Sequence, residues 1–115
     1  MNKKIDYQVR GRIWIKGPHG TFLGYGRVVL LERIRDHGSI SAAARSMSMS
    51  YRHAWKLVDS MNRQSRQPVV TMQTGGRGGG GARLTDAGQG AIDCFWSVYR
   101  DFQDFLSRGS ENLRL

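Results

Sequence analysis

Apolar and polar residues alternate along the first part of the chain. From Ile5 to Ile15 the odd positions are mostly apolar, and most of the even positions are charged or polar. A period of two is typical of a half-buried strand, and Gly11 suits a bend or bulge within it. We therefore predict an N-terminal strand over residues 5–15, followed by a glycine-rich turn region over residues 16–26.

The hydrophobic period then changes to that of a helix. Leu30, Leu31 and Ile34 share one face of a predicted helix over residues 27–37. Gly38 follows directly and suits the left-handed conformation that ends many helices.

Two more helices are predicted close behind the first. Ser41 can cap the N-terminus of a short helix built on three consecutive alanines, and Ser50 can cap a longer helix over residues 51–64. In the longer helix a core stripe recurs at i, i+3, i+4 and i+7. Its members are Ala54, Leu57, Val58 and Met61.

The segment after these helices reads as a β-hairpin. Strand-like residues at 68–74 and 82–84 flank a run that is rich in glycine and arginine, TGGRGGGGAR. Thr85 can cap a last helix that we expect to end near Ser107.

An apolar stripe follows this last helix at alternating spacings of three and four residues. It consists of Ile92, Phe95, Tyr99, Phe102 and Leu106. A stripe this aromatic exceeds what a small core absorbs alone, so we predict that it forms a homodimer interface.

Length and charge set the class of protein. The 115 residues suit one domain, residues 1–115, and the net charge is +9. Net charge is +5 over residues 1–38, +6 over residues 39–84 and −2 over residues 85–115. The basic middle predicts a polyanionic partner. Because the sequence has neither a membrane-spanning apolar run nor the apolar block of a signal peptide, we expect a cytoplasmic protein that does not contact a membrane.

The sequence predicts neither a metal site nor an enzyme. The single cysteine and three scattered histidines predict no metal site, and we expect no cofactor. Three glycines match a GxGxxG pattern. A P-loop is not expected, because no Lys-Ser/Thr follows, and neither is a dinucleotide-binding fold, because the remaining chain is too short for its parallel sheet. The cysteine is Cys94, the histidines are His19, His37 and His53, and the glycines of the pattern are Gly76, Gly78 and Gly81. The expected answer is that the protein is not an enzyme.

Three motifs in order identify a family resemblance. GSISAAAR (38–45), SYRHAW (50–55) and TGGRGGGGA (74–82) resemble the N-terminal domain of ModE-type, molybdate-responsive bacterial regulators, and more faintly that of LysR-type regulators. The resemblance implies a mainly α fold with small β, a winged helix-turn-helix. It comprises an N-terminal strand and turn region (1–25), the helix-turn-helix and wing (26–84) and a C-terminal dimerisation helix (85–115).

The chain departs from the family in three respects. Arg52 and Arg77 stand where lysine is frequent, which keeps the charge but allows bidentate contacts. Ser48 stands in the helix-turn-helix turn where family members often have glycine. No molybdate-binding domain follows Leu115, so molybdate is not expected as a ligand.

The resemblance implies a sequence-specific transcriptional regulator that binds double-stranded DNA as a dimer at a pseudo-palindromic site. The alternative is a non-specific, nucleoid-associated DNA-binding protein. The expected DNA-binding residues are Ser41, Ser50, Tyr51, Arg52, His53, Lys56, Arg77 and Arg83. Trp55 fits either a core position or a contact, and we favour the core because large aromatic side chains bury much apolar area.

Overall fold

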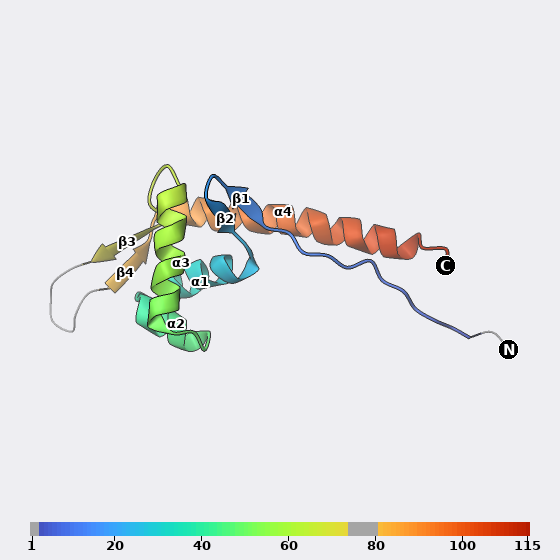
Figure 1. Cartoon of the computed structure of the whole chain (residues 1–115), viewed down its shortest axis with the longest axis horizontal. Helices are drawn as coiled ribbons and strands as arrows, with labels where there is room; N and C mark the ends of the chain where they lie inside the picture. Colours follow the sequence, from blue (N-terminus) through green and yellow to red (C-terminus); the bar gives the residue numbers. More distant parts are fainter. Residues whose placement is uncertain (1–2, 74–80) are drawn as a thin grey trace.

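The computed structural model describes residues 3–73 and 81–115. Four helices and two small antiparallel hairpins make up these residues, so the fold is mainly α with small β, as predicted (Figure 1). In chain order the elements are β1 (Ile15–Gly17), β2 (Gly20–Leu23), α1 (Tyr25–His37), α2 (Ile40–Ser46), α3 (Tyr51–Gln64), β3 (Val70–Gln73), β4 (Gly81–Leu84) and α4 (Asp86–Glu111).

The first three helices form the helix-turn-helix unit, in which capping residues mark the end of α1 and the start of α2 and α3. Gly38 ends α1 with φ 76°, and its N–H donates to the Ile34 carbonyl. The predicted cap of α2 is wrong by two residues, because Ser39 rather than Ser41 accepts a hydrogen bond from the Ala42 N–H. The chain turns into α2 directly after Gly38, so Ser41 already lies inside the helix.

The turn between α2 and α3 contains Ser48 in the left-handed region, with φ 53°. The Met49 N–H donates to the Ala44 carbonyl, which closes the end of α2. A serine therefore adopts the conformation for which glycine has no steric cost.

The predicted strand over residues 5–15 is wrong for most of its length. Residues 3–14 have no regular secondary structure, and only Ile15–Gly17 pairs, with Gly20–Leu23, in a hairpin that the turn prediction for residues 16–26 missed. Ile5 and Tyr7 are exposed. The alternating pattern has no partner strand within the described part of the chain, so the backbone cannot form a ladder there.

The second hairpin and α4 match the prediction more closely. Val70 pairs with Leu84 and Gln73 with Gly81, so β3 and β4 form the base of the expected wing. Thr85 caps α4 by accepting from the Gly88 N–H, and the helix continues four residues past the predicted end at Ser107.

The core lies where α1, α3, the second hairpin and the first half of α4 meet. It is built from Val28, Leu30, Leu31, Ile34, Ile40, Ala43, Ala44, Ala54, Val58, Met61, Val69, Val70, Ala82, Ile92 and Phe95, with Leu23 from β2. The second half of α4 projects beyond this core, with only the N-terminal segment beside it (Figure 1). The molecule is consequently elongated, with principal extents of 71 × 29 × 21 Å.

Candidate nucleic-acid interface

The outer face of α3 is basic. Ala54, Val58 and Met61 bury one side of the helix. Since each residue advances about 100° around a helix axis, Arg52, Lys56 and Arg63 share the opposite side, and all three are exposed. Asp59 on this side forms an ion pair with Arg63, with Nε and Oδ2 3.0 Å apart, so Arg52 and Lys56 keep most of the uncompensated charge.

The N-terminal turn of α3 carries four of the predicted contact residues. Ser50 caps the helix as predicted, and its Oγ accepts from the His53 N–H at 3.1 Å. Ser50, Tyr51, Arg52 and His53 are all exposed. The first N–H groups of a helix have no intrahelical acceptor, which makes this end favourable for a phosphate oxygen.

The expectation that Trp55 lies in the core is wrong. The Trp55 side chain is 45% exposed, and Tyr51, one turn earlier, is 51% exposed. Trp55 lies about 100° around the helix from Ala54, outside the arc that the core covers. Both aromatic residues are therefore on a flank of α3, between its buried and its basic sides.

Hydrogen bonds hold α3 against both hairpins. Asn62 Oδ1 accepts from the backbone N–H groups of Val69 (2.8 Å) and Val70 (3.2 Å), and Nδ2 donates to the Val70 carbonyl (2.9 Å). On the other side, Gln64 Nε2 donates to the Thr21 carbonyl at 2.9 Å. Neither side chain was predicted to have a role, because a single polar residue beside a core stripe carries no signal of its backbone partner.

A partly buried hydrogen bond also connects α3 to α1. Arg27 Nη1 donates to Ser60 Oγ at 3.0 Å. Partial burial lowers the pKa of the Arg27 guanidinium from its ordinary value, which still leaves it charged at neutral pH. Hydrogen bonds to both hairpins and to α1 thus fix the position of α3.

The remaining predicted DNA-binding residues lie apart from α3. Ser41 is half-buried on α2, and Arg83 is exposed on β4, where it lines a hollow of about 450 Å³ together with Arg35 and Gly38 at the end of α1. Arg77 lies outside the described residues. The structure therefore gathers five of the eight predicted residues on α3 and places two elsewhere.

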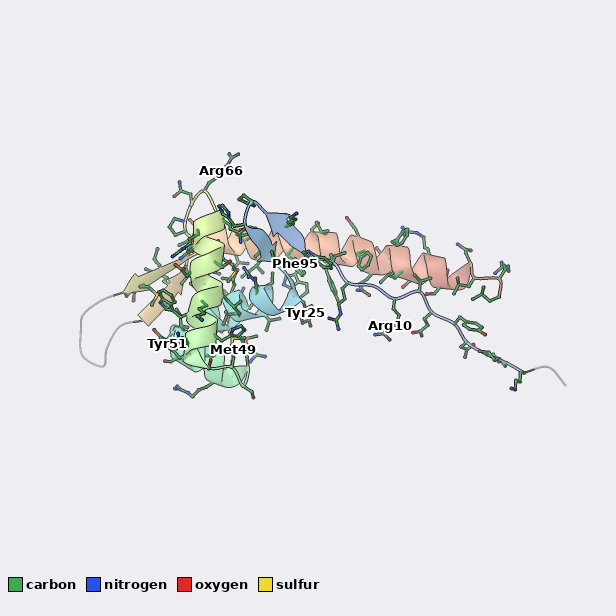
Figure 2. The ribbon with its side chains drawn as sticks, in the orientation of Figure 1. Arg10, Tyr25, Met49, Tyr51, Arg66 and Phe95 are labelled. Atoms are coloured by element: carbon green, nitrogen blue, oxygen red, sulfur yellow. The ribbon has the colours of Figure 1, made fainter. Side chains whose placement is uncertain are left out.

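The predicted dimer stripe is divided between two environments. Ile92 and Phe95 are covered by the core of their own chain, so they are not available to a partner, and that part of the prediction is corrected. Tyr99 and Phe102 are half-buried, and Leu106 is covered in a region lined by Val9 and Gly11 of the N-terminal segment. Tyr25 and Phe95, both labelled in Figure 2, each pack against Tyr99, with ring centroids 5.8 Å and 6.0 Å from that of Tyr99.

Two negative findings concern the part of the chain that the structure describes. No group of three or more His, Cys, Asp or Glu side chains is placed to hold a metal ion there. No helix among those residues is long and apolar enough to cross a bilayer.

Comparison with known proteins agrees with this geometry. Residues 26–89, from α1 to the start of α4, match the family described as bacterial regulatory helix-turn-helix protein, lysR family. The chain is 40% identical over 94 residues to the molybdenum transport protein ModE of Azotobacter vinelandii, covering 82% of this chain and 35% of that protein. It is 43% identical over 96 residues to the molybdenum-pterin-binding protein MopB of Rhodobacter capsulatus, covering 84% of this chain and 36% of that protein.

A third relative is the DNA-binding transcriptional dual regulator ModE of Escherichia coli K12. The identity is 44% over 69 residues, which cover 60% of this chain and 26% of that protein. The chain thus spans about a third or less of the length of these relatives. The family match covers more than half of the chain and coincides with the helix-turn-helix and wing that the structure shows, so this chain belongs to the lysR family of bacterial regulatory helix-turn-helix proteins.

Proposed function

We propose that this chain is the DNA-binding part of a bacterial transcriptional regulator that acts in the cytoplasm. It binds a pseudo-palindromic site as a homodimer, with α3 of each copy in the major groove. Helix-turn-helix dimers place their recognition helices about 34–36 Å apart, one turn of DNA. The net charge of +9 favours a polyanionic partner of this kind.

The basic outer face of α3 is the observation that carries the proposal. Arg52 and Lys56 are exposed one turn apart near the capped N-terminus, and a recognition helix reads base edges from this end. An arginine there can donate two hydrogen bonds to O6 and N7 of a guanine. Ser50, Tyr51 and His53 complete the contact surface.

The wing adds contacts that do not read sequence. Arg83 lies on β4, and Arg77 follows from the sequence alone, in the glycine-rich run between β3 and β4. Bare glycine backbone beside an arginine suits a phosphate backbone, because amide groups can approach the oxygens closely. We therefore expect Arg77→Ala to weaken binding to all duplexes about equally, with little change in site preference.

Competition between duplexes tests the proposal. Sites are selected from a random duplex library with the full chain, and the best site is then competed against bulk DNA at fixed salt. Specific binding requires a preference of about 10³ or more for the selected site. Equal affinity for all duplexes would instead support the non-specific, nucleoid-associated alternative, which the net charge alone also allows.

Arg52→Ala tests the assigned contact. We expect a loss of about 1–3 kcal/mol in binding free energy for the selected site and relaxed preference at one base pair per half-site. Arg100→Ala removes the same charge from the exposed surface of α4 and is the matched control. Equal losses of binding free energy in Arg52→Ala and Arg100→Ala would show that Arg52 contributes only its charge and reads no base.

A further inference from the structure

Two aromatic side chains on α3 are about half exposed and do not belong to the hydrophobic core. Tyr51 and Trp55 are four residues apart and therefore on the same side of the helix, which we call the aromatic flank. They are 51% and 45% exposed, although burying a large aromatic side chain is among the most favourable changes available to a protein. Exposed apolar surface of this kind marks a contact with a partner.

The aromatic flank borders the basic face on the side of the wing. Asn62 follows Trp55 by seven residues, so the two share one side of α3, and Asn62 bonds to the backbone of Val69 and Val70 at the start of β3. Figure 2 shows Tyr51 at the N-terminal end of α3, on the side toward the β3–β4 hairpin. A duplex that reaches both Arg52 and the wing therefore passes over this flank.

Duplex DNA offers one apolar group to a side chain in the major groove. This group is the 5-methyl of thymine, whereas the other base edges present hydrogen-bond donors and acceptors. Phosphates are charged and lie outside the groove, so they attract cationic side chains rather than an aromatic ring. The occupant that fits the aromatic flank is a thymine methyl.

We propose that Trp55, with Tyr51, reads thymine in the half-site by packing against its 5-methyl group. The inference rests on the proposed function, since it requires α3 to enter the major groove. It assigns Trp55 a specificity-determining role, distinct from the charged contacts of Arg52 and Lys56. The flank selects thymine over cytosine at one or two positions, next to whatever base pair Arg52 reads.

Uracil substitution isolates the methyl group. Each thymine of the selected site is replaced in turn by uracil, which keeps the base pair and removes only the methyl. Losing one buried methyl weakens binding by about fourfold. We expect this loss with the native chain at one or two positions per half-site, and a ratio near one at the same positions with Trp55→Ala.

Comparing thymine and uracil sites with the same protein preparation keeps the test valid when a variant is partly unfolded. The affinity ratio does not depend on the active fraction. Trp14→Ala removes an exposed tryptophan from the N-terminal segment and serves as the matched control, which should keep the uracil effect. Tyr51→Ala should reduce the effect at a position adjacent to that of Trp55.

The outcomes separate this inference from the proposed function. Site-specific binding with no uracil-sensitive position, or with the same uracil effect in Trp55→Ala, overturns the reading of thymine and leaves the regulator proposal standing. Uniform weakening by Trp55→Ala at all duplexes also overturns it and indicates packing against the sugar–phosphate backbone. Failure to select any site removes the proposed function itself.

Discussion

At the scale of single residues, Ser48 shows how the helix-turn-helix accommodates a residue other than glycine in the left-handed region. The residue has φ 53°, where a Cβ atom crowds the following carbonyl oxygen. Hydrogen bonds from the N–H groups of Ser48 and Met49 to the carbonyls of Arg45 and Ala44 hold this conformation. The turn therefore keeps its geometry at a local cost in free energy.

Ser48→Gly should stabilise the protein. Glycine removes the steric cost of the left-handed conformation but gains freedom in the unfolded chain, so the net rise in the free energy of unfolding is about 0.5–1 kcal/mol. Thermal or urea unfolding measures it. Ser46→Gly, two residues earlier at the C-terminal end of α2, is the control and should lower stability, because it removes the hydrogen bond that Ser46 Oγ donates to the Ala43 carbonyl and because glycine has a low helix propensity. A lower free energy of unfolding in Ser48→Gly would show that Ser48 is not strained in the left-handed conformation.

The Asn62 side chain fixes the start of the wing by bonding to the backbone of Val69 and Val70. Asn62→Asp keeps the oxygen that accepts from Val69 and Val70 but replaces the Nδ2 donor with an oxygen that faces the Val70 carbonyl. We expect the free energy of unfolding to fall by about 1–3 kcal/mol at neutral pH. Gln67→Glu, an exposed residue five positions on, makes the same chemical change and should have little effect.

At the scale of elements, α4 fits against the wing because of one glycine. A Cβ on Gly88 would collide with the Val69 carbonyl oxygen and with the Leu84 side chain. The first turn of α4 thus packs directly on the backbone that leads into β3. Because Thr85 caps this turn and its N–H donates to the Val69 carbonyl, the base of the wing and the start of α4 form one unit.

Gly88→Ala and Gly90→Ala should have opposite effects on stability. The first forces helix and wing apart and should lower the free energy of unfolding by about 1–3 kcal/mol. The second adds a methyl where nothing lies within 4 Å, and it should raise the free energy by about 0.5–1 kcal/mol through helix propensity. Chemical denaturation of both variants provides the comparison, and a stabilising Gly88→Ala would refute the close packing.

Periodicity and capping were sufficient to predict α1, α3, the second hairpin and α4, because each depends on residues close in sequence. The N-terminal strand failed because a strand also needs a partner, which a pattern of alternating residues does not supply. Trp55 failed for a related reason: residue type predicts burial, whereas its exposure follows from which arc of α3 the core covers. Asn62 and Gln64 bond to backbone atoms outside their own helix, seven or eight residues away for Asn62 and 43 for Gln64, so the pattern along α3 does not indicate their roles.

At the scale of the whole molecule, the second half of α4 extends beyond the hydrophobic core. Val98 and Phe105 are exposed on one side, seven residues apart, the spacing at which helices pair in a coiled coil. Phe102, near the same side, is half-buried, and a Cβ on Gly11 would contact its ring. A second copy of the chain is the partner proposed for this side, which leaves Ile92 and Phe95 to the core of each copy.

Phe105→Glu tests this dimer. The side chain is 59% exposed in the single chain, and a two-fold axis would bury it twice. Two phenylalanine contacts at about 1.5 kcal/mol each predict a dissociation constant raised by about a hundredfold or more. Ser97→Glu adds the same charge on another exposed side of α4 and should leave association unchanged. Analytical ultracentrifugation distinguishes the cases, and a native chain that sediments as a monomer at tens of micromolar would require the two half-sites to be bound independently.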